Sequence, residues 1–142
     1  MQIVDRLLEA PCYIIDFLPR QVPEDCEGQF FEVERYFLNN FERHGLRDRV
    51  IRILLKLMCY YPVSAYWGEW VEQPTPEQIV EMIDAVIEKH SEDLNMLFTG
   101  KEVLIQFGWD SLHISVYNPD EEMCKLLEQI AASEGMFWRK AE

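Results

Sequence analysis

Residues 102–117 have the sequence EVLIQFGWDSLHISVY, and their pattern predicts a β-hairpin. Two runs rich in β-branched and aromatic residues, 102–107 and 112–117, flank the segment 108–111, which contains glycine, aspartate and serine. Such a segment between two β-rich runs is typical of a turn. The hairpin therefore supplies two neighbouring strands of an antiparallel sheet.

The expected register of this hairpin follows from the length of its loop. A loop of four residues places Ile105 opposite Ile114 on one face, and Gln106 opposite His113 on the other. The first face is apolar and is expected to be buried, because successive side chains of a strand point to opposite faces.

Strands are also expected near 12–18 and 136–139, and residues 63–67 are expected to add an edge strand. Two helices have clear N-terminal signals, since Thr75-Pro76 and Asn118-Pro119 each place a capping residue before a proline. The second of these helices is expected to end at Gly135.

Residues 29–61 have helical periodicity that is broken near Gly45, which predicts two further helices. A chain of 142 residues with 49% hydrophobic and 13% aromatic content can bury a core in one domain. The whole pattern predicts a single α+β domain over 1–142, with helices packed on one face of a mostly antiparallel sheet.

Charge is distributed unevenly along the chain. The sequence has 26 acidic residues against 13 lysines and arginines, a net charge of −13, yet five of these cations lie between Arg43 and Lys56. Three of them, Arg49, Arg52 and Lys56, form a basic stripe on one helix. The chain as a whole would repel a polyanion, so we expect no direct binding to nucleic acid.

The basic stripe is instead expected to pair with acids of the same chain. The candidate partners belong to the preceding segment: Glu24, Asp25, Glu27, Glu32 and Glu34.

Four acids form a ridge on the helix that follows Thr75. The spacing of Glu77, Glu81, Asp84 and Glu88 places them on one stripe opposite the apolar face, and we call this set the acidic ridge. A solvated helix face explains the pattern, and so does a binding surface for a basic protein. The first interpretation is favoured by the need of any amphipathic helix to place charge outward. The second is favoured by the scarcity of cations, because segment 69–93 has eight acids and one lysine.

Aromatic residues are concentrated just before the ridge, at Tyr60, Tyr61, Tyr66, Trp67 and Trp70. Pro62, Gly68 and Pro74 suggest that this segment is a loop. Its aromatic rings either cover the core or anchor a partner, with Trp67 and Trp70 as the candidate anchors.

Asp16 interrupts an apolar strand and is expected to share a face with Ile14. If that face is covered, the carboxylate needs a donor such as Arg20 or His113. A pocket lined by Asp16, His113 and Tyr117 could bind a small molecule or support acid/base chemistry. The alternative is that Asp16 is a polar position on an edge strand or part of a structural pair.

Several classes of site are not indicated by the sequence. The four cysteines have no CxxC spacing and the histidines have no ligand partner three or four residues away, so we expect reduced thiols, no metal and no cofactor. No apolar run of membrane-spanning length and no secretory signal is present, so we expect a cytoplasmic protein without membrane contact.

Three segments carry a resemblance to known sequences: YIIDFLP at 13–19, LHISVYNP at 112–119 and EGMFW at 134–138. They resemble small acidic cytoplasmic proteins of gut-type Gram-positive bacteria, and the resemblance covers the ends of the chain. It implies a bacterial cytoplasmic setting, and it implies no activity and no site residues.

Our first functional hypothesis is a non-enzymatic module that binds a basic protein through the acidic ridge, in the manner of an immunity protein or inhibitor. A second hypothesis is a small-molecule-binding or enzymatic domain with its pocket near Asp16 and His113. A third is a structural subunit of a homo-oligomer, and the sequence leaves the oligomeric state open.

Overall fold

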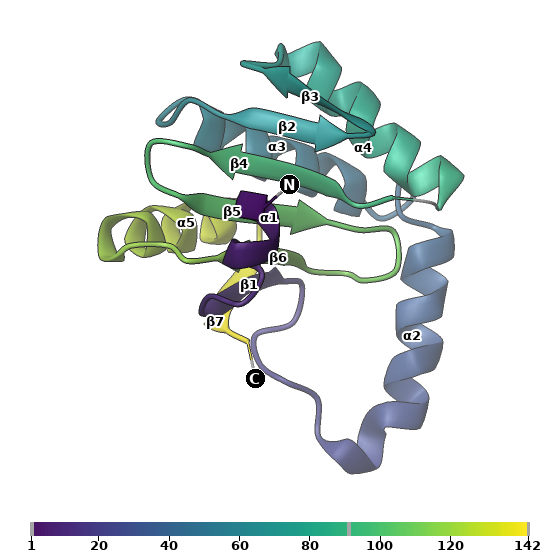
Figure 1. Cartoon of the computed structure of the whole chain (residues 1–142). Coiled ribbons are helices and arrows are strands. Elements are labelled where there is room, and N and C mark those ends of the chain that lie inside the picture. The colour runs from purple at the N-terminus through teal and green to yellow at the C-terminus, as the bar shows by residue number, and fades with distance from the viewer. Residues whose placement is uncertain (1, 91, 142) are drawn as a thin grey trace.

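A computed structural model describes residues 2–90 and 92–141 of the chain (Figure 1). The elements in chain order are α1 (Gln2–Leu7), β1 (Cys12–Asp16), the 3-10 helix η1 (Glu24–Cys26), α2 (Glu27–Asn39), α3 (Leu46–Met58), β2 (Ser64–Trp67), β3 (Glu69–Glu72), α4 (Pro76–Lys89), β4 (Leu94–Phe98), β5 (Val103–Phe107), β6 (Ile114–Tyr117), α5 (Glu121–Ser133) and β7 (Phe137–Lys140).

The strands form one sheet in the order β3-β2-β4-β5-β6-β1-β7, and every neighbouring pair is antiparallel. The predicted α+β class with an antiparallel sheet is therefore confirmed. The hairpin of β5 and β6 lies inside the sheet, whereas β3 and β7 form its two edges.

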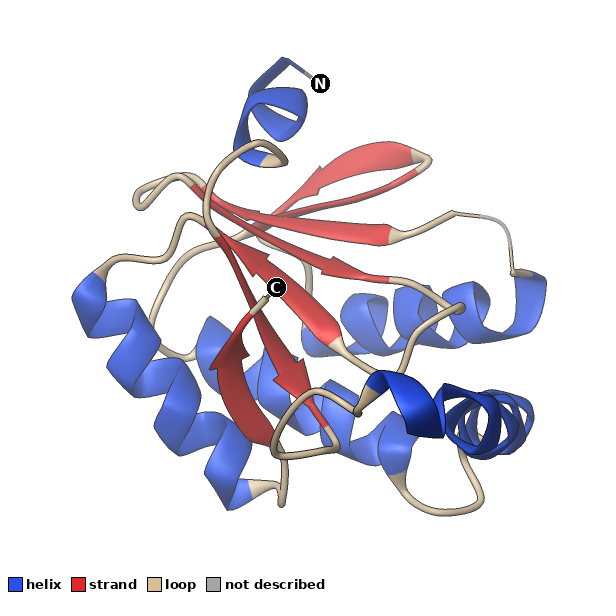
Figure 2. Ribbon diagram, turned by 90° about the horizontal axis from the view of Figure 1, so that it is seen from below, coloured by secondary structure: helices blue, strands red, loops and turns tan. Residues whose placement is uncertain are grey.

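Helices α3, α4 and α5 cover one face of the sheet, and Figure 2 shows α1 on the opposite side. Successive side chains of β4 point to opposite faces of the sheet. Met96 and Phe98 therefore join the main core under α3, α4 and α5, while Leu97 faces α1. On that second face, Val4 and Leu7 of α1 pack with Leu97 and Leu104.

The register of the central hairpin differs from the predicted one by two residues. Ile105 lies opposite Val116 rather than Ile114, and Gln106 lies opposite Ser115 rather than His113. The connection spans residues 108–113, and it includes Leu112 and His113, which were expected in the strand. Because a shift of two residues keeps every side chain on its own face, the prediction of the buried face is nevertheless correct.

The aromatic segment, which was expected to be a loop, forms the hairpin of β2 and β3. Gly68 turns the chain with φ +81°, a conformation that side chains with a Cβ rarely adopt. Strand β2 pairs with both β3 and β4, so the predicted edge strand at 63–67 is an inner strand. Strand β4 was not predicted, since its sequence LNMLF has no β-branched residue and contains an asparagine, which is depleted in strands.

Thr75 caps α4 as predicted, with a complete capping box between Thr75 and Gln78. The predicted cap of α5 is wrong by two residues. Asp120, not Asn118, accepts a hydrogen bond from the Met123 N–H at 2.8 Å. Asn118 instead donates its backbone N–H to the Pro11 carbonyl at 2.9 Å, which joins the end of β6 to the start of β1.

Helix α2 stands away from the sheet, as Figure 1 shows, and none of its residues is fully buried. Phe31, Val33 and Tyr36 are exposed on it. Phe37 holds the helix against the body of the protein, because its ring lies 5.4 Å from that of Phe17. Within residues 2–90 and 92–141, no helix combines the length and apolar character needed to cross a membrane.

Candidate functional site

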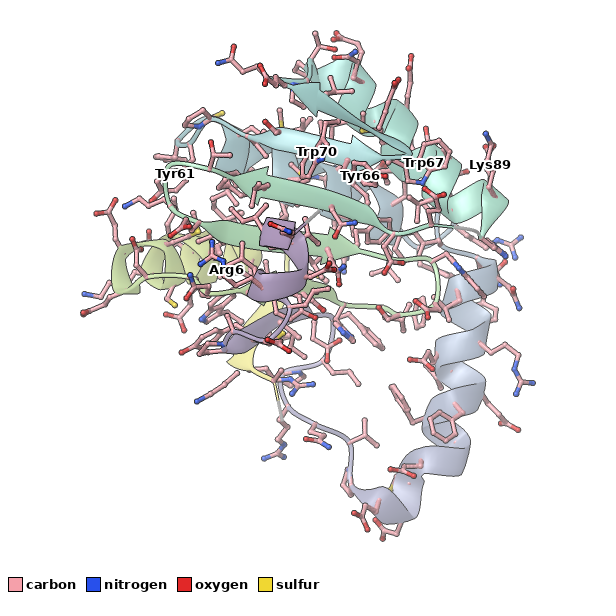
Figure 3. All side chains as sticks on the ribbon, in the orientation of Figure 1. Arg6, Tyr61, Tyr66, Trp67, Trp70 and Lys89 are labelled. Carbon is pink, nitrogen blue, oxygen red and sulfur yellow. The ribbon has the colours of Figure 1, made fainter. Side chains whose placement is uncertain are left out.

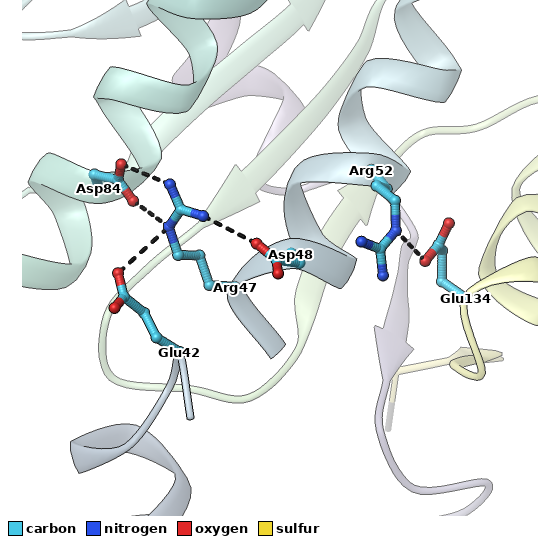
Figure 4. Close-up of polar contacts among 6 residues, drawn as sticks. All are labelled: Glu42, Arg47, Asp48, Arg52, Asp84 and Glu134. Carbon is cyan, nitrogen blue, oxygen red and sulfur yellow. Dashed lines mark hydrogen bonds and ion pairs between the residues drawn. The ribbon is translucent and has the colours of Figure 1, made fainter. Parts of the chain in front are cut away.

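The acidic ridge is divided by the structure into a paired and an unpaired part. Asp84 accepts two hydrogen bonds from the Arg47 guanidinium, at 2.6 Å from Nε and 2.9 Å from Nη2 (Figure 4). These hydrogen bonds raise the pKa of Arg47. Glu77, Glu81 and Glu88 are exposed and have no ion pair within the described part of the chain. Asp84 therefore joins α3 to α4, and the other three acids remain available to a partner.

Two members of the basic stripe are neutralised internally, as predicted, but by a different acid. Arg52 Nε lies 2.7 Å from the carboxylate of Glu134, which follows α5 (Figure 4). Lys56 Nζ lies 2.7 Å from the same carboxylate. Burial raises the pKa of Glu134, but the hydrogen bonds from Lys56 and Arg52 outweigh it, so this pKa lies below its usual range. The predicted partners between Glu24 and Glu34 do not make these contacts.

A groove of about 420 Å³ lies between β3 and α4. Its lining residues are Trp67, Glu69, Val71, Gln78, Glu81, Met82 and Ala85, and we call it the acidic groove. Trp67 and Glu81 thus line one depression, which connects the aromatic hairpin with the acidic ridge. The Trp67 indole N–H donates to the Glu92 carbonyl at 3.2 Å, and Lys89 Nζ lies 5.1 Å from the ring centroid.

Trp70 does not join Trp67 in the acidic groove. Its strand neighbour across the hairpin is Tyr66, and their ring centroids are 5.1 Å apart on the other face of the sheet (Figure 3). The two predicted anchors, Trp67 and Trp70, therefore lie on opposite faces of the sheet.

Asp16 lies in a cavity of about 350 Å³ between the end of β1 and α2. We call it the Asp16 cavity; its lining residues are Ile14, Asp16, Phe17, Leu18, Arg20, Gln21, Val22, Glu27, Phe30, Phe31, Glu34, Leu112, His113, Arg139 and Ala141. Asp16 and His113, which the sequence suggested as pocket residues, thus line the same cavity. Tyr117 does not line it, and packs beneath α1 with the second apolar cluster.

The donor for Asp16 is Arg139, rather than Arg20 or His113. Arg139 Nη2 donates to Asp16 Oδ2 at 2.9 Å, and the backbone N–H of Phe17 donates to Oδ1 at 2.8 Å. Asp16 is only 8% exposed, so these bonds satisfy a carboxylate that is almost cut off from water. Arg139 Nε is buried and has no hydrogen-bond partner among the described residues.

Two other titratable groups of the cavity are perturbed mainly by burial. Desolvation lowers the pKa of His113, which is partly opposed by the charge of Asp16. Desolvation and the charges of Asp16 and Asp110 raise the pKa of Glu34. The cavity therefore holds a neutral imidazole and a carboxylate that is poorly solvated.

Arg139 and Glu34 are two charged cavity residues that sequence reasoning missed. Arg139 lies on β7, and only the pairing of β7 with β1 brings it to Asp16. Glu34 had a weak signal, because Glu27, Phe30 and Glu34 share one face of a helix at spacings of three and four residues.

Among the described residues, no group of three or more His, Cys, Asp or Glu side chains is placed to hold a metal ion, and the four cysteines are free. No protein-family model, curated protein or solved structure matches the chain. Geometry and charge therefore carry the functional interpretation.

Protonation of His113 is expected to destabilise the folded protein as the pH falls from 7.5 to 5. The folded pKa of His113 is lowered, so the unfolded chain binds the proton more readily below an ordinary histidine pKa of about 6.5. Urea unfolding across this range should show a smaller decrease for His113→Gln than for the wild type. Glu34 and Asp93, whose folded pKa values are raised, act in the opposite direction in both proteins and cancel in the difference. Parallel curves would contradict a lowered pKa of the half-buried His113 imidazole.

Proposed function

We propose that this protein is a non-enzymatic interaction module that binds a basic segment of another protein along the free edge of β3 and the acidic face of α4. The observation that carries the proposal is the acidic groove, because it adjoins an unpaired strand edge and has both apolar and carboxylate lining. Neither feature alone would specify a partner. Together they match an extended chain that carries basic side chains.

The edge of β3 offers main-chain hydrogen-bonding groups. The Gln73 N–H donates to the Val63 carbonyl at 3.0 Å, which marks these residues as a hydrogen-bonded pair. Bonded pairs alternate along antiparallel strands, so the main-chain groups of Trp70 and Glu72 point toward the free edge. An added strand would bind there.

The side chains around this edge favour a cationic partner. Glu69 and Glu72 on β3, and Glu77 and Glu81 on α4, are exposed and form no ion pair within the described residues. The net charge of −13 adds to the negative electrostatic field of these acids and accelerates encounter with a basic protein. A second copy of the chain or a nucleic acid would instead bring further negative charge to the edge.

The partner that fits this surface is a protein with an exposed, lysine- or arginine-rich strand. Proteins that bind nucleic acids carry such segments, since they must contact phosphates. An immunity protein or inhibitor that neutralises a nucleic-acid-binding toxin would use this arrangement, and we propose this role for the chain.

Reversing the charge of the ridge is expected to weaken binding of a basic peptide at least tenfold. The probe is an eight-residue peptide of alternating lysine and valine, and affinity is measured by NMR titration of the ¹⁵N-labelled protein. The variant combines Glu77→Lys, Glu81→Lys and Glu88→Lys, and retains Asp84 because it binds Arg47. Each lost attraction contributes about 0.2–1 kcal/mol, and the new lysines add repulsion.

The matched control is the triple variant Glu24→Lys, Glu32→Lys and Glu128→Lys, which changes the net charge equally but leaves β3 and α4 intact. In the wild type and the control, the shifted amides should be those of β3 and α4, and affinity should decrease with added salt. An equal loss of affinity in both triple variants would mean that net charge alone determines binding, and it would contradict a defined site. So would shifts located away from β3 and α4.

A further inference from the structure

The Asp16 cavity has the size of a small-molecule site, and it lies at the β7 side of the sheet, away from the acidic groove beside β3. Its volume of about 350 Å³ falls within the range of ligand pockets. The end of β1 and Arg139 of β7 form its floor, while segment 17–22 and α2 form its walls. Binding here would be independent of binding at β3.

The walls of the cavity are apolar and aromatic. Phe17 and Leu18 follow β1, and Phe30 and Phe31 come from the first turns of α2. Phe31 is 49% exposed, so its ring is accessible to a ligand in the cavity. Aromatic rings attract apolar bodies, and their faces also attract cations.

The charges in the cavity are not balanced. Asp16 is neutralised by Arg139 on the floor, and Arg20 is exposed at the rim. Glu34 on the α2 wall is half-buried, and Glu27 lies about two helical turns before it. Neither has an ion pair within the described part of the chain. Burial removes water from the Glu34 carboxylate and raises its pKa. No cation of the described residues compensates for this loss of hydration.

These features distinguish between charged ligands. An anion would have to approach Arg20 through the field of a protein with net charge −13, since Arg139 is already used by Asp16. A cation would supply Glu34 with its missing partner and would lie against aromatic rings. His113 is neutral and can accept or donate a hydrogen bond without repelling either.

We infer that the Asp16 cavity binds a small organic cation, a protonated amine attached to an apolar or aromatic body. The ammonium group pairs with Glu34, and the body packs against Phe17, Phe30 and Phe31. The floor pair of Asp16 and Arg139 keeps its own hydrogen bonds and shapes the site.

Three probes of similar shape test this assignment: 2-phenylethylamine as the cation, 2-phenylethanol as the neutral compound and 3-phenylpropionate as the anion. Affinities are measured by titration of the ¹⁵N-labelled protein, which also locates the site. The amine should bind about tenfold more tightly than the alcohol, and the anion should bind most weakly. Equal binding of all three, or preference for the anion, would overturn the inference.

Two isosteric variants on α2 separate a specific contact from general charge. Glu34→Gln should weaken binding of the amine about tenfold and leave binding of the alcohol unchanged. Glu32→Gln removes the same charge from an exposed position that does not line the cavity, and it should have no effect. An unchanged affinity in Glu34→Gln, or amine-induced shifts confined to β3 and α4, would refute the site. Neither outcome would contradict the binding of a basic peptide at β3.

Discussion

Replacing Phe98 with alanine is expected to lower the free energy of unfolding by about 3–5 kcal/mol, the usual cost of removing a buried aromatic ring. Phe98 is fully buried on the core face of β4, where its backbone pairs with Val103 of β5. The ring of Tyr61 contacts it edge-on at 6.4 Å between centroids. Strand β4 lies between β2 and β5, so a cavity at Phe98 weakens packing between the β2–β3 hairpin and the central strands.

Urea denaturation followed by circular dichroism measures this loss. Phe98→Leu retains most of the buried volume and should cost less than Phe98→Ala. Phe137→Ala is the exposed control, because Phe137 on the edge strand β7 is 41% exposed, and its effect should remain within about 0.5 kcal/mol. Similar losses in Phe98→Ala and Phe137→Ala would contradict the position of β4 inside the sheet.

Replacing Asp16 with leucine is expected to lower the free energy of unfolding by about 2–4 kcal/mol. The substitution removes the acceptor of Arg139 in a place where the two side chains are only 12% and 21% exposed. Arg139 Nε already has no partner among the described residues, so the guanidinium would be left with little compensation for its desolvation.

A double-mutant cycle separates this coupling from the loss of packing. Asp16→Leu combined with Arg139→Met replaces the pair with apolar side chains and should restore most of the stability, because no unpaired charge remains. The same cycle on Arg6 and Glu102, whose side chains are 59% and 55% exposed, should give a coupling of about 0–1 kcal/mol. A coupling at Asp16 no larger than that of the exposed pair would contradict a desolvated ion pair.

The predictions that succeeded concern features set by neighbouring residues. Thr75 and Pro76 start α4 because capping requires side chains and amides only three residues apart. The members of the acidic ridge share a helix face because of the helical repeat alone. The buried face of the central hairpin follows from the alternation of apolar and polar residues, which can be read from the sequence of each strand alone.

The errors occurred where two alternatives are locally equivalent. A register shift of two residues in the central hairpin leaves every side chain on the same face. The local pattern therefore does not determine the length of the 108–113 connection, and tertiary packing does. Leu112 is buried in the core and thereby draws this connection inward. Asn118 and Asp120 are both good helix caps, and the contact between Asn118 and Pro11 selects the second.

The amino-acid sequence on its own specified the α+β class, the helical faces, the negative charge and its concentration on α4, because each depends on composition or on a short period. Only the tertiary structure decided which charges meet. Arg139 reaches Asp16, Glu134 reaches Arg52 and Lys56, and Arg47 reaches Asp84, across separations that no local pattern encodes. Pairing of β1 with β7 and packing of α3 against α4 and α5 bring these groups within hydrogen-bonding distance. These contacts neutralise most of the basic helix and leave Glu77, Glu81 and Glu88 exposed.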